Sequence, residues 1–119
     1  MTLRRALWER GLRYRLHAKD LPGTPDIVFR SSKLVVFVDG DFWHGRDWEM
    51  RKEKLSRGAN SSYWVSKIAY NRERDRENDA KLTRMDWLVV RFWETDIKRN
   101  LVAFVDQIER LVALRKACI

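Results

Sequence analysis

Residues 26–40 read DIVFRSSKLVVFVDG, and this stretch decides which fold the sequence predicts. Two short runs rich in β-branched and aromatic residues, DIVF and KLVVFV, flank the polar residues RSS, a pattern typical of a β-hairpin. The second run is almost wholly apolar, which indicates a strand buried on both faces. We therefore expect two paired strands, with Asp26 at the start of the first and Asp39 at the end of the second.

The segments around the hairpin complete a mixed α/β pattern. Residues 2–11 have the apolar spacing of a short helix, and residues 12–17 alternate like a half-exposed strand. Residues 40–60 lack any period and predict a long loop, followed by a long polar helix over residues 60–84. Residues 87–93 predict a strand, and the apolar residues from Ile97 to Leu111 predict one amphipathic helix. This α-β-β-β-α-β-α order predicts a mixed sheet with helices on it, in which strand 87–93 and the second hairpin strand are central.

Composition limits the class of protein. The 119 residues fit one domain over 1–119, and a hydrophobic content of 45% is enough for a core. No apolar run reaches the length of a membrane span, and the arginine-rich start lacks the apolar region of a secretory signal. Cys118 is the only cysteine, which excludes an intrachain disulfide and favours a reducing, cytoplasmic compartment.

Charge is the strongest compositional signal. The net charge of +8 and the pI near 10.1 predict a polyanionic partner, nucleic acid before an anionic membrane surface. Solubility alone is the alternative explanation of such a charge.

Asp26 and Asp39 are candidate metal ligands. If the two hairpin strands pair, the start of one lies beside the end of the other, and both carboxylates meet at one end of the sheet. Neighbouring carboxylates repel each other unless a cation or a proton lies between them, and Mg²⁺ or Mn²⁺ prefers such oxygen ligands. The alternative is that Asp26 caps a turn and Asp39 ends a strand.

The stretch GDFWHG, residues 40–45, combines an imidazole with two large aromatic side chains just after a strand. His44 has a side chain that can relay protons near neutral pH. Phe42 and Trp43 are large for a loop, and apolar wedges that unstack bases are known in DNA-binding proteins. The alternative is that they cover the end of the sheet. Trp64, at the start of the polar helix, poses the same question and is more typical of a core residue.

The polar helix carries a stripe of side chains suited to phosphates. Lys67, Asn71, Arg74 or Asp75, and Asn78 recur at spacings of three or four residues along it. Asn71 and Asp75 have groups that can hold water around a metal, and the cations can neutralise phosphates. A charged face that is simply solvated is the alternative.

Four strings, LRYRLHAKDLPGTPDIVF, VVFVDGDFWHG, YWVSKIAYNRERDREND and WLVVRFWE, occur in one order. Together they resemble the very short patch repair (Vsr) endonucleases, a branch of the PD-(D/E)XK nucleases, from about Leu3 to Asp96. The resemblance implies the restriction-endonuclease-like fold. It also implies a Mg²⁺- or Mn²⁺-dependent enzyme that hydrolyses a phosphodiester bond and nicks double-stranded DNA at a T:G mismatch. A MutL-type mismatch-repair protein is a candidate partner.

The resemblance also implies roles for single residues. Asp26 matches the metal-binding aspartate, and the main-chain carbonyl of Val38 matches a second metal ligand. His44 matches the histidine that activates water, and Asn71 matches an active-site asparagine. Asp39 replaces a histidine usual in the family and is a further candidate ligand. The expected DNA contacts are, in chain order, Phe42, Trp43, Trp64, Lys67 and Arg74.

One departure from the family concerns zinc. Asp41, Arg46, Trp48 and Thr95 stand where relatives carry the cysteines and the histidine of a structural zinc site. We therefore expect no structural zinc. An ion pair of Arg46 with an acid, or packing of Trp48, is expected to hold the loop instead.

Two other functions fit the same residues. One is a nuclease of the same fold with a different DNA target, such as a restriction or mobile-element enzyme. The other is a DNA-binding module that has kept the fold and lost turnover. Metal-dependent nicking separates the enzymes from the module, and a preference for T:G over matched duplex separates repair from restriction.

Overall fold

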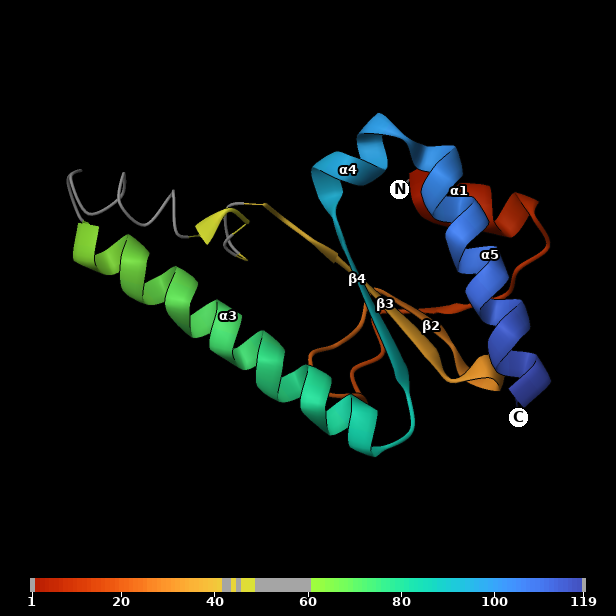
Figure 1. Cartoon of the computed structure of the whole chain (residues 1–119), viewed down its shortest axis with the longest axis horizontal. Coiled ribbons are helices and arrows are strands. Elements are labelled where there is room, and N and C mark those ends of the chain that lie inside the picture. Colours follow the sequence, from red (N-terminus) through yellow and green to blue (C-terminus); the bar gives the residue numbers. More distant parts are fainter. Residues whose placement is uncertain (1, 42–43, 45, 49–60, 119) are drawn as a thin grey trace.

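The computed structural model describes residues 2–41, 44, 46–48 and 61–118, and its elements follow the predicted order (Figure 1). An N-terminal helix precedes three strands, a long helix follows, and a fourth strand leads into two C-terminal helices. Their bounds are α1 (Thr2–Glu9), β1 (Arg15–Leu16), β2 (Ile27–Phe29), η1 (Arg30–Ser32), β3 (Leu34–Asp39), α3 (Ser61–Arg84), β4 (Leu88–Trp93), α4 (Glu94–Arg99) and α5 (Leu101–Cys118).

The four strands form one mixed sheet in the order β1-β2-β3-β4. β1, β2 and β3 are antiparallel neighbours, and β4 runs parallel to β3, from the pair Leu34–Leu88 to the pair Asp39–Trp93. The predicted hairpin is confirmed. Its connection is a single 3₁₀ turn that ends at Lys33, whose φ of 52° places it in the left-handed region.

The position predicted for the fourth strand is wrong. β3 is internal as expected, but β4 lies at the edge of the described sheet. Its continuous apolar run arises because both of its faces are covered. Leu88, Val90 and Phe92 pack into the core under α5, whereas Val89 packs on the side of α3. Burial on two faces gives an edge strand the sequence of a central one.

Helices lie on both faces of the sheet (Figure 1), and each face has its own hydrophobic core. On one face, α1, α4 and α5 pack against the alternate residues Leu34 and Val36 of β3. On the other face, Val35 and Phe37 pack against Leu82 of α3 and the loop before β2. Because side chains alternate along a strand, Asp39 follows Val35 and Phe37 onto the face of α3.

The C-terminal segment was predicted as one helix, and it is two. α4 ends at Arg99 and α5 begins at Leu101, with Asn100 between them at φ −148° and ψ 65°. The Asn100 side chain accepts a hydrogen bond from the N–H of Ala103 (3.4 Å), which makes it the N-cap of α5. The apolar spacing continues across the break, because Ile97 and Val105 pack into the same core. No helix in the described ranges is long and apolar enough to cross a membrane.

Candidate active site

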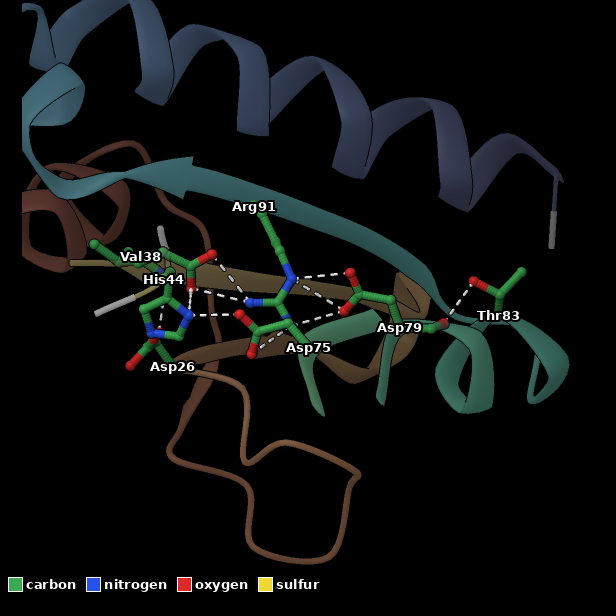
Figure 2. A network of polar contacts seen from close by, with 8 residues as sticks. Asp26, Val38, His44, Asp75, Asp79, Thr83 and Arg91 are labelled. Atoms are coloured by element: carbon green, nitrogen blue, oxygen red, sulfur yellow. Dashed lines mark hydrogen bonds and ion pairs between the residues drawn. The ribbon is translucent and has the colours of Figure 1, made fainter. Parts of the chain in front are cut away.

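The candidate site lies where the start of β2, the end of β3 and the inner side of α3 meet (Figure 2). Since Ile27 pairs with Val36, Asp26 comes opposite the last residues of β3. The N–H of Val38 donates a hydrogen bond to Oδ2 of Asp26 (2.8 Å). Asp26, Asp39 and His44 line one cavity of about 460 Å³. The expected convergence of the two carboxylates at one end of the sheet is confirmed.

Asp26 is the more accessible of the two carboxylates. Its side chain is 35% exposed, against 8% for Asp39. It also borders a second hollow of about 390 Å³ on the other face of the sheet, together with Leu3 and Glu94. Because its side chain is partly exposed, Asp26 can be approached by a cation or a phosphate from the cavity that it shares with His44.

Asp39 is enclosed and already paired. Both of its carboxylate oxygens accept hydrogen bonds from Nη1 of Arg91, at 3.0 and 3.1 Å. Burial raises the pKa of Asp39, although the charges of Arg91 and His44 act in the opposite direction. Asp39 is thus a buried carboxylate whose oxygens face a fixed cation.

His44 is oriented by Asp75. Its Nδ1 lies 2.6 Å from Oδ2 of Asp75 and 3.7 Å from Oδ1 of Asp39. An ionised carboxylate only accepts hydrogen bonds, so Nδ1 donates and Nε2 is left as the basic nitrogen. The hydrogen bond that Nδ1 donates to Asp75 raises the pKa of His44, against the effect of burial and with help from the charge of Asp39. This arrangement of imidazole and carboxylate suits proton transfer.

Comparison with known proteins identifies the family. The profile described as "DNA mismatch endonuclease Vsr" matches residues 1–50. "Type II nicking enzyme V.HpaIIP" of Haemophilus parainfluenzae is 38% identical over 112 residues, which cover 94% of this chain and 78% of that protein. "Type II nicking enzyme V.XorIIP" of Xanthomonas oryzae pv. oryzae is 45% identical over 96 residues, which cover 81% of this chain and 68% of that protein. The chain belongs to the Vsr family. "DNA mismatch endonuclease Vsr" of Escherichia coli is 34% identical over 88 residues, 74% of this chain and 54% of that protein.

The fold and the family together identify a DNA endonuclease. The mixed sheet with helices on both faces agrees with the restriction-endonuclease-like fold expected from the Vsr resemblance. The cavity that holds Asp26 and His44 is thus the candidate active site of a DNA-cutting enzyme.

The other predicted residues divide into three groups. Arg74 lines the cavity of Asp26 and His44, and Asn71 is buried one helical turn before Asp75. Lys67 borders a different hollow near the start of α3, where Trp64 packs edge to face against Tyr63 with ring centroids 4.9 Å apart. Phe42 and Trp43 lie outside the described residues.

Sequence reasoning missed Arg91 and Asp79 and left Asp75 as one of two alternatives. Asp75 and Asp79 are one turn apart on the side of α3 that also buries Ile68 and Leu82. Four residues at this spacing mark an inward face, and that signal was available in the sequence. The signal for Arg91 was a single cation within the apolar run LVVRFW.

The described residues of the loop after β3 are held by the contacts that the sequence predicted. Arg46 pairs with Asp96 (2.8 Å) and Asp41 (3.1 Å), and the hydroxyl of Thr95 donates to Asp41 (2.8 Å). Trp48 is buried. The ion pair of Arg46 and the packing of Trp48 are both confirmed. The contacts of Arg46 and Asp41 join the loop to the start of α4, and the centroid of the Trp48 ring lies 5.7 Å from the guanidinium carbon of Arg72 in α3.

Proposed function

We propose that this Vsr-family endonuclease nicks one strand of duplex DNA at a T:G mismatch, by hydrolysis of a phosphodiester bond with a divalent metal. The observation that carries the proposal is the single cavity in which Asp26, His44 and Asp75 meet, on a chain with a net charge of +8. The name of the relative from Escherichia coli supports a mismatch as the target.

His44 is the proposed proton acceptor. Because Asp75 accepts the hydrogen bond from Nδ1, Nε2 is the nitrogen that takes a proton from the attacking water. The raised pKa makes the imidazole a stronger base, and it also requires a pH high enough to keep the ring neutral before the reaction. Asp75 stabilises the imidazolium that forms.

Asp26 and the main-chain carbonyl of Val38 are the proposed ligands of Mg²⁺ or Mn²⁺. Both supply oxygen atoms, which hard divalent cations prefer, and Asp26 is accessible from the cavity. A divalent cation held by these oxygens would neutralise charge on the scissile phosphate and on the leaving oxygen. Asp39 is a third candidate ligand, and its oxygens accept hydrogen bonds from Arg91.

The remaining predicted residues are proposed to contact DNA. Arg74 and Lys67 would neutralise phosphates. Arg74 lies at the rim of the cavity, and Lys67 lies about two helical turns before it on the exposed side of α3. Asn71 would order water or a phosphate oxygen near Asp75. The proposed wedges that unstack bases beside the mismatch are Phe42, Trp43 and Trp64.

A second target is favoured by a specific observation. The relatives with identities of 38% and 45% are named type II nicking enzymes rather than mismatch endonucleases. The second candidate function is therefore nicking at a different DNA target, as in a restriction or mobile-element enzyme. For the repair function, we further propose action in the bacterial cytoplasm and a MutL-type protein as partner.

Single-turnover nicking tests the target. Two duplexes that differ only in one T:G or T:A pair are cut with Mg²⁺, with Mn²⁺, and with a chelator. We expect a nick 5′ of the mispaired thymine in the T:G duplex, with either metal and not with the chelator. Equal cutting of both duplexes would favour the second candidate function over mismatch repair. No cutting under any condition would mean that the protein is a DNA-binding module without nuclease activity.

A further inference from the structure

Arg91 is the residue of the site to which neither the Vsr resemblance nor the expected chemistry assigns a role. It lies on β4, where the parallel register pairs it with Phe37 of β3. Its guanidinium carbon is 4.0 Å from the centroid of the Phe37 ring. The side chain is only 20% exposed, so the cation is held within the sheet–α3 interface.

Both edges of the guanidinium are occupied by carboxylates (Figure 2). On one edge, Nε and Nη2 donate to Asp79 of α3, at distances down to 2.7 Å. On the other edge, Nη1 donates to both oxygens of Asp39. Nη2 also lies 3.8 Å from Oδ1 of Asp75. With Phe37 under one face, the position of the cation is fixed from three sides.

The surroundings of Arg91 resemble a metal-binding group. In the described part of the chain, one group of three potential ligands, Asp39, His44 and Asp75, has ligand atoms within 4.8 Å of one another. Such a group attracts a divalent cation when nothing else neutralises it. Here Arg91 already supplies a positive charge in hydrogen-bond contact with Asp39 and close to Asp75. A second cation between the same carboxylates would be repelled by the guanidinium.

We propose that Arg91 is a built-in cation that keeps divalent metal out of the Asp39–His44–Asp75 cluster. Arg91 is then a positioning residue. It confines the metal to the side of Asp26 and leaves the His44 imidazole free for proton transfer. The inference rests on the proposed function, in which Asp26 holds the metal. The inference narrows the proposed metal site, because Asp39 is then not a metal ligand. Asp39 instead holds Arg91 by accepting its hydrogen bonds.

The position of Asp39 gives this role a second support. The family resemblance places a histidine there in relatives, and this chain carries an acid instead. A histidine would not balance a buried guanidinium, whereas Asp39 accepts hydrogen bonds from it with both oxygens. Asp39 and Arg91 thus form a charge pair that bridges β3 and β4. Asp79 of α3 accepts hydrogen bonds from the other edge of the same guanidinium.

Mn²⁺ binding, measured by calorimetry and by the loss of the free-ion electron paramagnetic resonance signal, tests the inference. The proteins are the unaltered chain, Asp26→Asn, Arg91→Met and the double variant. We expect one Mn²⁺ site in the unaltered chain, weakened at least about tenfold by Asp26→Asn. Arg91→Met should gain a second site, and that site should persist in the double variant. Arg10→Met is the control, since Arg10 also pairs with a carboxylate, Asp106 (2.6 Å), away from the cluster.

Two results would overturn the inference. One is an Arg91→Met protein that binds a single Mn²⁺ and loses it in the double variant. The other is a change in the ¹⁵N signals of the His44 ring that indicates ligation when Mg²⁺ is added to the unaltered chain. The second measurement needs no variant, so it decides the matter even if Arg91→Met does not fold. Unchanged Mn²⁺ binding in Asp26→Asn alone would instead count against the proposed metal site.

Discussion

The two faces of the sheet use the same strands in opposite ways. On the face of α1 and α5, Leu34 and Val36 of β3 are buried in an apolar core that continues to the helices. On the face of α3, the apolar residues Val35 and Phe37 give way to Asp39. On this face the apolar core ends at Phe37. At the end of β3, a network of carboxylates, His44 and Arg91 takes its place. One face therefore holds the sheet together, and the other carries the residues of the proposed active site.

The largest difference between the faces is expected in catalysis. Replacing the proposed base, His44→Ala, should lower the single-turnover nicking rate by about 10²–10⁴-fold, the range for general acid–base catalysis. DNA binding should remain. His17→Ala is the matched control, because His17 is exposed and its Nδ1 is 4.0 Å from Asp26. Equal losses in the two variants would remove His44 from its proposed role.

Stability should respond most on the opposite face. Ile108 of α5 is fully buried against the sheet, so Ile108→Ala should cost about 2–5 kcal/mol of unfolding free energy. Val102 lies on the same helix with 62% exposure, and Val102→Ala should change the unfolding free energy by less than about 0.5 kcal/mol. Urea denaturation measures both. A small effect of Ile108→Ala would mean that α5 does not support the sheet.

A smaller effect is expected from the charge network. Asp79→Asn replaces the carboxylate that accepts from Nε and Nη2 of Arg91 by a neutral amide with one acceptor oxygen. It should lower the unfolding free energy by about 1–2 kcal/mol, as for a partly buried charged hydrogen bond. Asp106→Asn breaks an exposed pair with Arg10 and should leave the melting temperature unchanged. Thermal denaturation at low and high salt compares the two, and equal sensitivity to salt would contradict the burial of the network.

The smallest change concerns protonation. Asp75→Asn replaces the carboxylate that accepts the Nδ1 hydrogen bond of His44 by a neutral amide, so the pKa of His44 should fall, as measured by NMR titration of the ring. Because the folded pKa lies above the unfolded value of 6.5, the pair stabilises the fold fully below that value. The contribution is lost as the pH rises through the folded pKa. An unchanged pKa in Asp75→Asn would assign the shift to Asp39.

The sequence predicted the order of elements and the meeting of Asp26 with Asp39, because both follow from local patterns. Alternation and β-branched residues define the hairpin, and antiparallel pairing then brings its two ends together. The edge position of β4 was not predictable in this way, since covering helices give an edge strand the same apolar run. The inward spacing of Asp79 along α3 was readable from the sequence, but its pairing with Arg91 was not. That pairing depends on how α3 crosses the sheet, and residues 12 positions apart on different elements leave no periodic signal.

The proposed active site is the cavity shared by Asp26 and His44, and its role in cutting DNA can be measured directly. Single-turnover nicking of a T:G duplex with Mg²⁺ is followed for the unaltered chain, Asp26→Asn and the control Asp106→Asn. We predict that Asp26→Asn binds the duplex with unchanged affinity and produces no nick, while Asp106→Asn cuts at the unaltered rate. Cutting by Asp26→Asn at the unaltered rate would show that Asp26 does not take part in catalysis.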